Sequence, residues 1–210
     1  MSIATETGAP IAPWAEVVPG APPHMTVDDL LAWPDDDGYR YELVEGVLVR
    51  MAGSEKRATR LGLRIGARLL DHVDAHGLGI VTGADGVYMF PGAETGLLPD
   101  AGFYTRERDA LIPAEDEDRA IPFAPDLAVE VASPSQGSSA MAAKARIYLA
   151  GGTRLVWVVW PARGQIDVWH PGDIEPVTFS GNSTLDGEDV VPGFHLRLAD
   201  LFAFSAAVTT

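Results

Sequence analysis

Hydrophobic side chains recur at helical spacing in one long segment of the chain. Between residues 55 and 75, four aliphatic residues stand four positions apart: Leu61, Ile65, Leu69 and Val73. This spacing places them on one face of a helix, while basic residues recur at the same interval on another face. Gly77 follows as a typical C-terminal signal. The pattern predicts an amphipathic helix over residues 55–75.

Shorter patterns predict strands and further helices. Two β-prone stretches, 39–44 and 47–51, flank Glu45-Gly46, a connector typical of a β-hairpin. Thr26 begins a short helix that Pro34 ends. Further strands are predicted at residues 80–82, 86–90, 100–104, 125–132, 155–160, 165–170 and 176–179, and further helices at 136–150 and 198–202. The order indicates an α/β (α+β) fold, with a sheet flanked by helices.

Composition restricts the class of protein. The 210 residues suit one domain, which we expect over residues 25–205, and 47% hydrophobic residues are enough for a core. Residues 1–24 are rich in Pro, Ala and Gly without any period, so we expect a flexible N-terminal extension. The absence of cysteine excludes disulfides, zinc-thiolate sites and cysteine nucleophiles. No apolar run is long enough for a membrane span, so we expect a soluble cytoplasmic protein.

The formal charge of −15 predicts that the molecule as a whole repels nucleic acid. Much of the acid falls in two runs, 35–37 and 115–118. Basic residues gather instead around the predicted long helix: Arg50, Lys56, Arg57, Arg60, Arg64 and Arg68. Because salt confines the field of a charge to about 8–10 Å, such a stripe can contact phosphates on an acidic protein. A solvated helix face fits the same pattern.

Familiar catalytic motifs are absent. The histidines form no HxH or HExxH metal-ligand set, and His72 and His76, four positions apart, are more typical of a solvated helix end. The sequence also contains no P-loop, G-x-S-x-G elbow or dinucleotide-binding glycine motif. Nucleotide binding and serine-hydrolase chemistry therefore have no support.

Carboxylates mark two predicted strands. Alternation along residues 125–132 puts two acids and two alanines on one face: Asp126, Glu130, Ala128 and Ala132. The small alanines leave room for an ion, and Mg²⁺ binds through one or two carboxylates plus water. Asp100 opens another strand after Pro99 and could share the ion with Glu130 if the strands are neighbours. On the pattern alone, two carboxylates on a solvated sheet face are the favoured interpretation.

Lys144 lies on the predicted helix that follows the Glu130 strand. It is one of only two lysines in the chain. A lysine close to a metal-bound water can orient that water or stabilise developing negative charge. A surface lysine on an amphipathic helix is the alternative.

Several short motifs occur in a fixed order: YELVEGVLV at 41–49, LPDAGF at 98–103, PDLAVEVASPS at 125–135, Lys144 before Tyr148, and VPGFHLRLADLF at 191–202. In order and spacing they resemble the Uma family of putative restriction endonucleases, within the PD-(D/E)XK nuclease superfamily. The resemblance implies a restriction-endonuclease-like fold, with a mixed central sheet, flanking helices and an N-terminal hairpin. It also implies a divalent-metal nuclease site.

The resemblance also implies roles for individual residues. Asp100 and Glu130 correspond to the metal-binding acids, and Lys144 takes the place of the catalytic lysine, because the position two residues after Glu130 is Ala132. Glu42 and Asp126 correspond to auxiliary acidic positions. The chain departs from the family pattern at Ala140, at Trp160 and early in the long helix, where it has arginines.

The expected function is therefore a Mg²⁺- or Mn²⁺-dependent endonuclease that hydrolyses DNA. Its DNA binding should be weak and salt-dependent, through Lys56, Arg57, Arg60, Arg64 and Arg68. Two alternatives stay open. One is a non-catalytic domain that binds nucleic acid or protein and retains the nuclease fold, and the other is an acidic surface that serves a basic partner or a homodimer.

Overall fold

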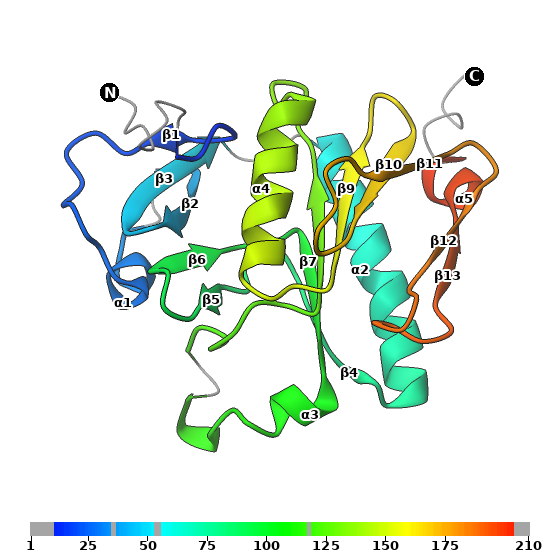
Figure 1. Ribbon diagram of the computed structural model, residues 1–210, viewed down its shortest axis with the longest axis horizontal. Coiled ribbons are helices and arrows are strands. Elements are labelled where there is room, and N and C mark those ends of the chain that lie inside the picture. The colour runs from blue at the N-terminus through cyan, green and yellow to red at the C-terminus, as the bar shows by residue number, and fades with distance from the viewer. Residues whose placement is uncertain (1–10, 35–36, 53–55, 117–118, 204–210) are drawn as a thin grey trace.

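The computed structural model describes residues 11–34, 37–52, 56–116 and 119–203, and it contains two main β-sheets (Figure 1). The first sheet has five strands: Glu16–Val17 (β1), Tyr39–Val44 (β2), Val47–Ala52 (β3), Tyr88–Phe90 (β5) and Thr95–Leu97 (β6). Their order is β1-β3-β2-β6-β5, and all neighbours are antiparallel. Glu45 and Gly46 turn the expected hairpin with φ values of 50° and 74°, as a two-residue hairpin turn requires.

The second sheet has six strands: Gly79–Thr82 (β4), Ala101–Thr105 (β7), Leu127–Val131 (β8), Leu155–Trp160 (β9), Gln165–Trp169 (β10) and Val177–Ser180 (β11). Their order is β11-β10-β9-β8-β7-β4. Only the β8–β9 pair in this sheet is parallel. A parallel pair needs a crossover connection, which the helix Ser138–Ala150 (α4) supplies. The mixed sheet with flanking helices is confirmed.

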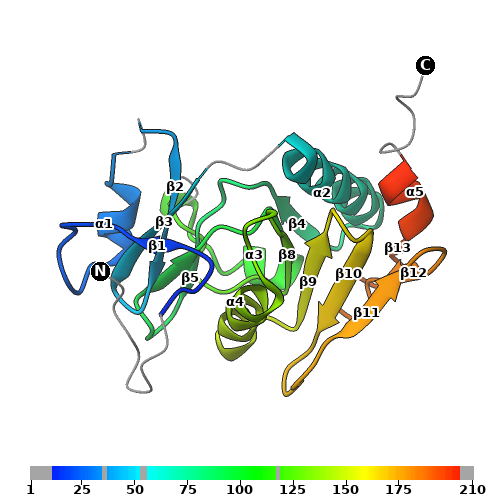
Figure 2. The same cartoon turned by 90° about the horizontal axis from the view of Figure 1, so that it is seen from above.

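Helices cover both faces of the second sheet. The other helices are Val27–Leu31 (α1), Lys56–His76 (α2), Arg106–Asp109 (α3) and Leu198–Phe202 (α5), with a 3-10 turn at Ala114–Asp116. Figure 2 shows α2 and α4 on opposite sides of β8 and β9. The four aliphatic residues of the α2 stripe are buried in one cluster with Leu127, Val129 and Val131. The predicted inward faces of α2 and β8 are therefore confirmed.

The expectation of a flexible N-terminal extension is wrong for residues 11–24, which pack against the first sheet. β1 pairs with β3, and Ala12, Trp14 and Val18 are buried. The segment shows no period in sequence because its apolar side chains insert one at a time and its strand has only two residues. Residues 1–10 of the expected extension lie outside the described residues.

Very short elements escaped the sequence prediction. β1, β6 and the ribbon Thr184–Asp186 (β12) and His195–Arg197 (β13) have two or three residues each, which is too few for a period to appear. Within the two acidic runs, residues 35–36 and 117–118 lie outside the described residues. No helix in the described part of the chain is long and apolar enough to cross a membrane.

Gly102 provides a test of how the two sheets fit together. It lies on β7, and a Cβ at this position would overlap the fully buried ring of Tyr88 on β5. We expect Gly102→Ala to lower the free energy of unfolding by about 1–3 kcal/mol, because overpacking forces the core to shift. Chemical denaturation measures the change. Gly83→Ala is the control, since its added methyl group meets open space; equal effects of the two substitutions would contradict the packing.

Candidate active site

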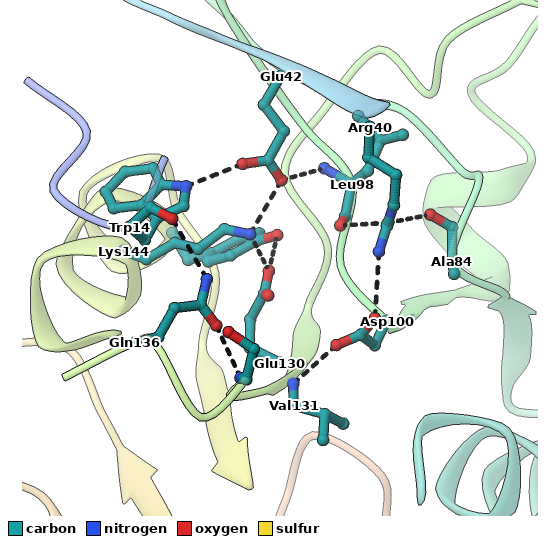
Figure 3. A network of polar contacts seen from close by, with 12 residues as sticks. Trp14, Arg40, Glu42, Ala84, Leu98, Asp100, Glu130, Val131, Gln136 and Lys144 are labelled. Atoms are coloured by element: carbon teal, nitrogen blue, oxygen red, sulfur yellow. Dashed lines mark hydrogen bonds and ion pairs between the residues drawn. The ribbon is translucent and has the colours of Figure 1, made fainter. Parts of the chain in front are cut away.

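A buried lysine joins the two sheets. The Lys144 side chain comes from α4 and is only 2% exposed. Its Nζ lies 2.9 Å from Glu42 Oε1 on β2 and 2.8 Å from Glu130 Oε1 on β8 (Figure 3). Burying an ammonium group is costly unless carboxylates and hydrogen bonds compensate for the lost water. Two carboxylates from different sheets supply that compensation.

Glu42 is held on both of its oxygens. Trp14 Nε1 donates to Oε2 at 3.0 Å, and the backbone N–H of Leu98 donates to Oε1 at 3.0 Å. The Glu42 side chain is fully buried. It therefore acts as a fixed counter-charge to Lys144. The family resemblance gave it an auxiliary place, and the structure puts it beneath the lysine.

Glu130 keeps one oxygen without a donor. Tyr148 Oη donates to Oε1 at 2.7 Å, the same oxygen that contacts Lys144. Glu130 Oε2 accepts no hydrogen bond from the described residues. The room expected beside Ala128 and Ala132 is filled by apolar side chains, including those of α4. Small side chains on β8 let the helix pack closely there, and the site cavity opens at the Glu130 end of the strand.

Asp100 lies beside Glu130. The antiparallel pairing of β7 and β8 matches Ala101 with Val129, and continuing this register by one residue places Asp100 opposite Glu130. The expected neighbourhood of the two strands is thus confirmed. Val131 N–H donates to Asp100 Oδ2 at 2.7 Å, and Arg40 Nη1 donates to Oδ1 at 3.3 Å.

Asp100, Glu130 and Lys144 line one cavity. The cavity has a volume of about 660 Å³, and all three side chains face it. Residues 13–16 of the N-terminal segment and the 133–136 loop after β8 form further walls. The Gln136 side chain connects these walls, because its Nε2 donates to Trp14 O at 3.3 Å. The sequence-predicted catalytic trio therefore converges on one open site.

Burial and mutual charge set the protonation of the site. Burial raises the pKa of Glu130 to about 7, with Lys144 opposing the rise and Glu42 and Asp100 adding to it. For Lys144, burial disfavours the charged amine, but Glu130 and Glu42 outweigh it and raise the pKa. Burial and the nearby Glu130 carboxylate raise the pKa of Tyr148 well above its usual value. At neutral pH, Lys144 is an ammonium and Tyr148 is a hydrogen-bond donor.

The donor set fits a hard divalent cation. Among the described residues, no group of three or more His, Cys, Asp or Glu side chains forms a metal-ligand cluster. Mg²⁺ keeps several waters and needs only one or two carboxylates. Asp100 and Glu130 meet this requirement, since both face the cavity and Glu130 Oε2 has no donor in the described part of the chain. A zinc site built from histidines has no such basis here.

Asp126 lies away from this site. Its carboxylate accepts from Thr105 N–H at 3.0 Å and from Arg108 Nη1 at 2.9 Å. Four residues along a strand separate it from Glu130, about 13 Å of backbone. At that distance Asp126 cannot belong to the same site as Glu130, although the sequence pattern put both on one strand face. Its contacts with Thr105 and Arg108 instead anchor the start of β8.

The basic stripe of α2 divides between two surroundings. Gly62 faces Asp100. Arg60 and Arg64 each stand two positions from Gly62, which is a rotation of about 200° about the helix axis, so both point to the side of α2 away from Asp100. Arg64 Nη2 donates to Asp200 O in α5 at 2.9 Å. Arg57 borders the 133–136 loop that also lines the site cavity. Phosphate contacts by Lys56, Arg57, Arg60, Arg64 and Arg68 stay a prediction, and Arg57 is the member that the structure brings toward the site.

Two site residues gave little signal in the sequence. Arg40 alternates with Glu42 on β2, so a charged pair two positions apart could have suggested a shared face. Trp14 lies in a segment without periodicity, and nothing in its local sequence points to Glu42. Both contacts depend on how distant segments meet.

Comparisons with known proteins agree with the geometry. The Uma2 family model, described as "Putative restriction endonuclease", matches residues 27–199. The fold is similar to the crystal structure of "a putative nuclease belonging to DUF820 from Anabaena variabilis ATCC 29413". The two chains are 20% identical with a TM-score of 0.71, over 86% of this chain and 98% of that one. No match is found among the curated proteins.

Removing the lysine amine tests the buried charge cluster. Lys144→Met leaves Glu42 and Glu130 without their cation, so we expect a loss of about 3–5 kcal/mol in unfolding free energy. Chemical denaturation measures it. The only other lysine, Lys56, is exposed on α2, and Lys56→Met should change stability by less than about 0.5 kcal/mol. Similar small effects for both variants would show that the cluster is not stabilising.

The raised pKa of Glu130 predicts a pH dependence of stability. The folded state holds this proton up to about pH 7, while an unfolded Glu releases it near its ordinary pKa of 4.5. Because the folded state binds more protons in that window, the contribution of Glu130 to stability falls as pH rises from 4.5 to 7. Glu130→Gln should remove this slope in denaturation curves at several pH values. If the dependence of unfolding free energy on pH is unchanged in Glu130→Gln, a group other than Glu130 binds the proton.

Proposed function

Since the chain belongs to the Uma2 family of putative restriction endonucleases, we propose that it is a divalent-metal-dependent endonuclease that hydrolyses phosphodiester bonds in DNA. The family supports a nuclease role. The dependence on a metal ion and the DNA substrate go beyond what the family supports, and they are our proposal. One observation carries them: two acids from neighbouring strands and a buried ammonium group face one cavity.

Asp100 and Glu130 are the residues that would hold Mg²⁺ or Mn²⁺. When bound, such an ion supplies a bound water of lowered pKa and neutralises phosphate charge. The backbone N–H of Val131 orients Asp100, and Tyr148 orients Glu130. Fixed partners of this kind keep the two acids in place without occupying Glu130 Oε2.

Lys144 is assigned the role of an electrostatic donor. Its raised pKa keeps it protonated, so it cannot remove a proton from water at neutral pH. It faces the cavity and can donate to a phosphate oxygen as negative charge develops there. The amine donates a hydrogen bond to Glu42, and Trp14 donates one to the other oxygen of Glu42. A protonated amine suits both roles expected for this lysine, orientation of the attacking water and stabilisation of charge, and it excludes a role as general base.

Electrostatics favour weak binding of the DNA. The chain carries a net charge of −15, but two arginines, Arg40 and Arg50, line the site cavity. Together with Lys144 they face three acids on the same wall, so cations stand where a phosphate would enter but give no excess of positive charge there. Binding through a few phosphate contacts is expected to weaken steeply as salt concentration rises.

Asp100→Asn tests the proposed activity with little change of shape. We expect wild-type protein to nick supercoiled plasmid with Mg²⁺ or Mn²⁺ and to stop when a chelator removes the ion. Asp100→Asn should lower the cleavage rate by at least about a hundredfold, because one metal ligand loses its charge. Gel electrophoresis of the plasmid measures both.

Asp126→Asn is the matched control, since Asp126 directly precedes the strand of Glu130 and does not line the cavity. It should cleave at nearly the wild-type rate once circular dichroism shows that it is folded. Cleavage that resists the chelator, or equal rates for wild type and Asp100→Asn, would refute the proposed metal site. Metal binding without any cleavage would favour a non-catalytic domain instead.

A further inference from the structure

Arg40 occupies a central position that the nuclease proposal leaves unexplained. It lies on β2, two residues before Glu42, and its guanidinium reaches the Asp100 carboxylate (Figure 3). Its Nη2 donates to the carbonyl oxygens of Leu98 and Ala84. Its Nε is buried and has no hydrogen-bond partner among the residues that the structure describes. Arg40 is therefore a cation placed against a proposed metal ligand.

The contact between Arg40 and Asp100 is a loose one. A single nitrogen meets a single oxygen at 3.3 Å, whereas charge-assisted hydrogen bonds are usually about 2.7–2.9 Å and arginine pairs are often bidentate. The other Asp100 oxygen is held at 2.7 Å by Val131 N–H. Asp100 therefore stays fixed when Arg40 moves, and its Oδ1 is the oxygen that becomes available.

The charges of the site give Arg40 a reason to move. Asp100, Glu130 and Glu42 face two cations, Lys144 and Arg40. A divalent ion between Asp100 and Glu130 would reverse this balance and repel the guanidinium. Because a guanidinium stays charged at all ordinary pH values, Arg40 cannot respond by losing a proton. It can only change partner.

Space for that change exists on both sides of Arg40. Arg40 and Asp100 line the site cavity, and both also line a second cavity of about 500 Å³ along α2. Two glycines, Gly62 and Gly66, and the exposed Leu63 form part of the second cavity's wall. The guanidinium therefore borders open space in two cavities, and turning into either of them would cost only its own contacts with Asp100, Leu98 O and Ala84 O.

We propose that Arg40 holds Asp100 in the metal-free protein, gives it up to the divalent cation, and then binds a phosphate oxygen of the substrate. The inference rests on the proposed function for its substrate. The planar fork of Arg suits both partners, because it recognises carboxylate and phosphate oxygens alike. Arg40 is thus a competitor of the metal and a phosphate contact in turn.

Metal affinity tests the competition without any measurement of activity. Isothermal titration of Mg²⁺ or Mn²⁺ into Arg40→Met should give a dissociation constant about tenfold lower than wild type, because a charge at this range shifts an ionic equilibrium by at least about one log unit. Arg40→Lys, which keeps the charge, should lie close to wild type. Arg50→Met is the control: Arg50 lines the same cavity but pairs with Glu16, so its removal should change the constant less than about twofold.

Cleavage at saturating metal tests the phosphate contact. Arg40→Met should nick plasmid about a hundredfold more slowly than wild type although it binds metal more tightly, and Arg40→Lys should recover part of the rate. Unchanged or weaker metal affinity in folded Arg40→Met would overturn the competition, and equal cleavage would overturn the phosphate contact. If wild-type protein binds metal but cleaves no DNA, the nuclease proposal fails, while the titration still decides whether Arg40 competes for Asp100.

Discussion

Lys144 carries its charge in the interior of the protein, and the arrangement of the two sheets around the site depends on that charge being matched. Glu42 reaches the amine from the five-stranded sheet and Glu130 from the six-stranded sheet. Removing either carboxylate would leave a buried cation under-compensated, which costs several kcal/mol. The N-terminal segment is drawn into the same arrangement, because Trp14 hydrogen-bonds to Glu42 and closes one wall of the cavity. The two ion pairs of Lys144 and the Trp14 hydrogen bond thus link α4, both sheets and the N-terminal segment.

The topology turns this buried charge into an open site. β7 and β8 are antiparallel neighbours, so their Asp100 and Glu130 ends meet, and the α4 crossover from β8 to β9 brings Lys144 back over the same end. Small side chains on β8 let α4 pack closely, and the site cavity opens beside Glu130. The site combines a firmly held ammonium with acids that have loosely held or free oxygens, a combination suited to a cation that comes and goes with its substrate.

Much of this could be predicted from the sequence, for reasons that are local. The α2 stripe and the alternation of β8 are periodic, so their buried faces were predictable, and the Glu45-Gly46 hairpin follows from its turn. Asp100, Glu130 and Lys144 came from motifs in a fixed order, and the structure places them on one cavity. Asp126 shows the limit of such patterns. Alternation placed it on the same strand face as Glu130, but residues four positions apart on one face are too far from each other to share a site. Trp14 and Arg40 were missed because their contacts join segments whose encounter no local pattern encodes.

The proposed chemistry requires that Asp100 and Glu130 form one divalent-metal site beside the buried Lys144. Crystals soaked in Mn²⁺ and measured with anomalous scattering would locate the ion. We expect an anomalous peak within about 2.5 Å of an oxygen of each carboxylate, with the Lys144 amine still between Glu42 and Glu130. No peak in that cavity at saturating Mn²⁺, or a peak bound by other side chains, would contradict it.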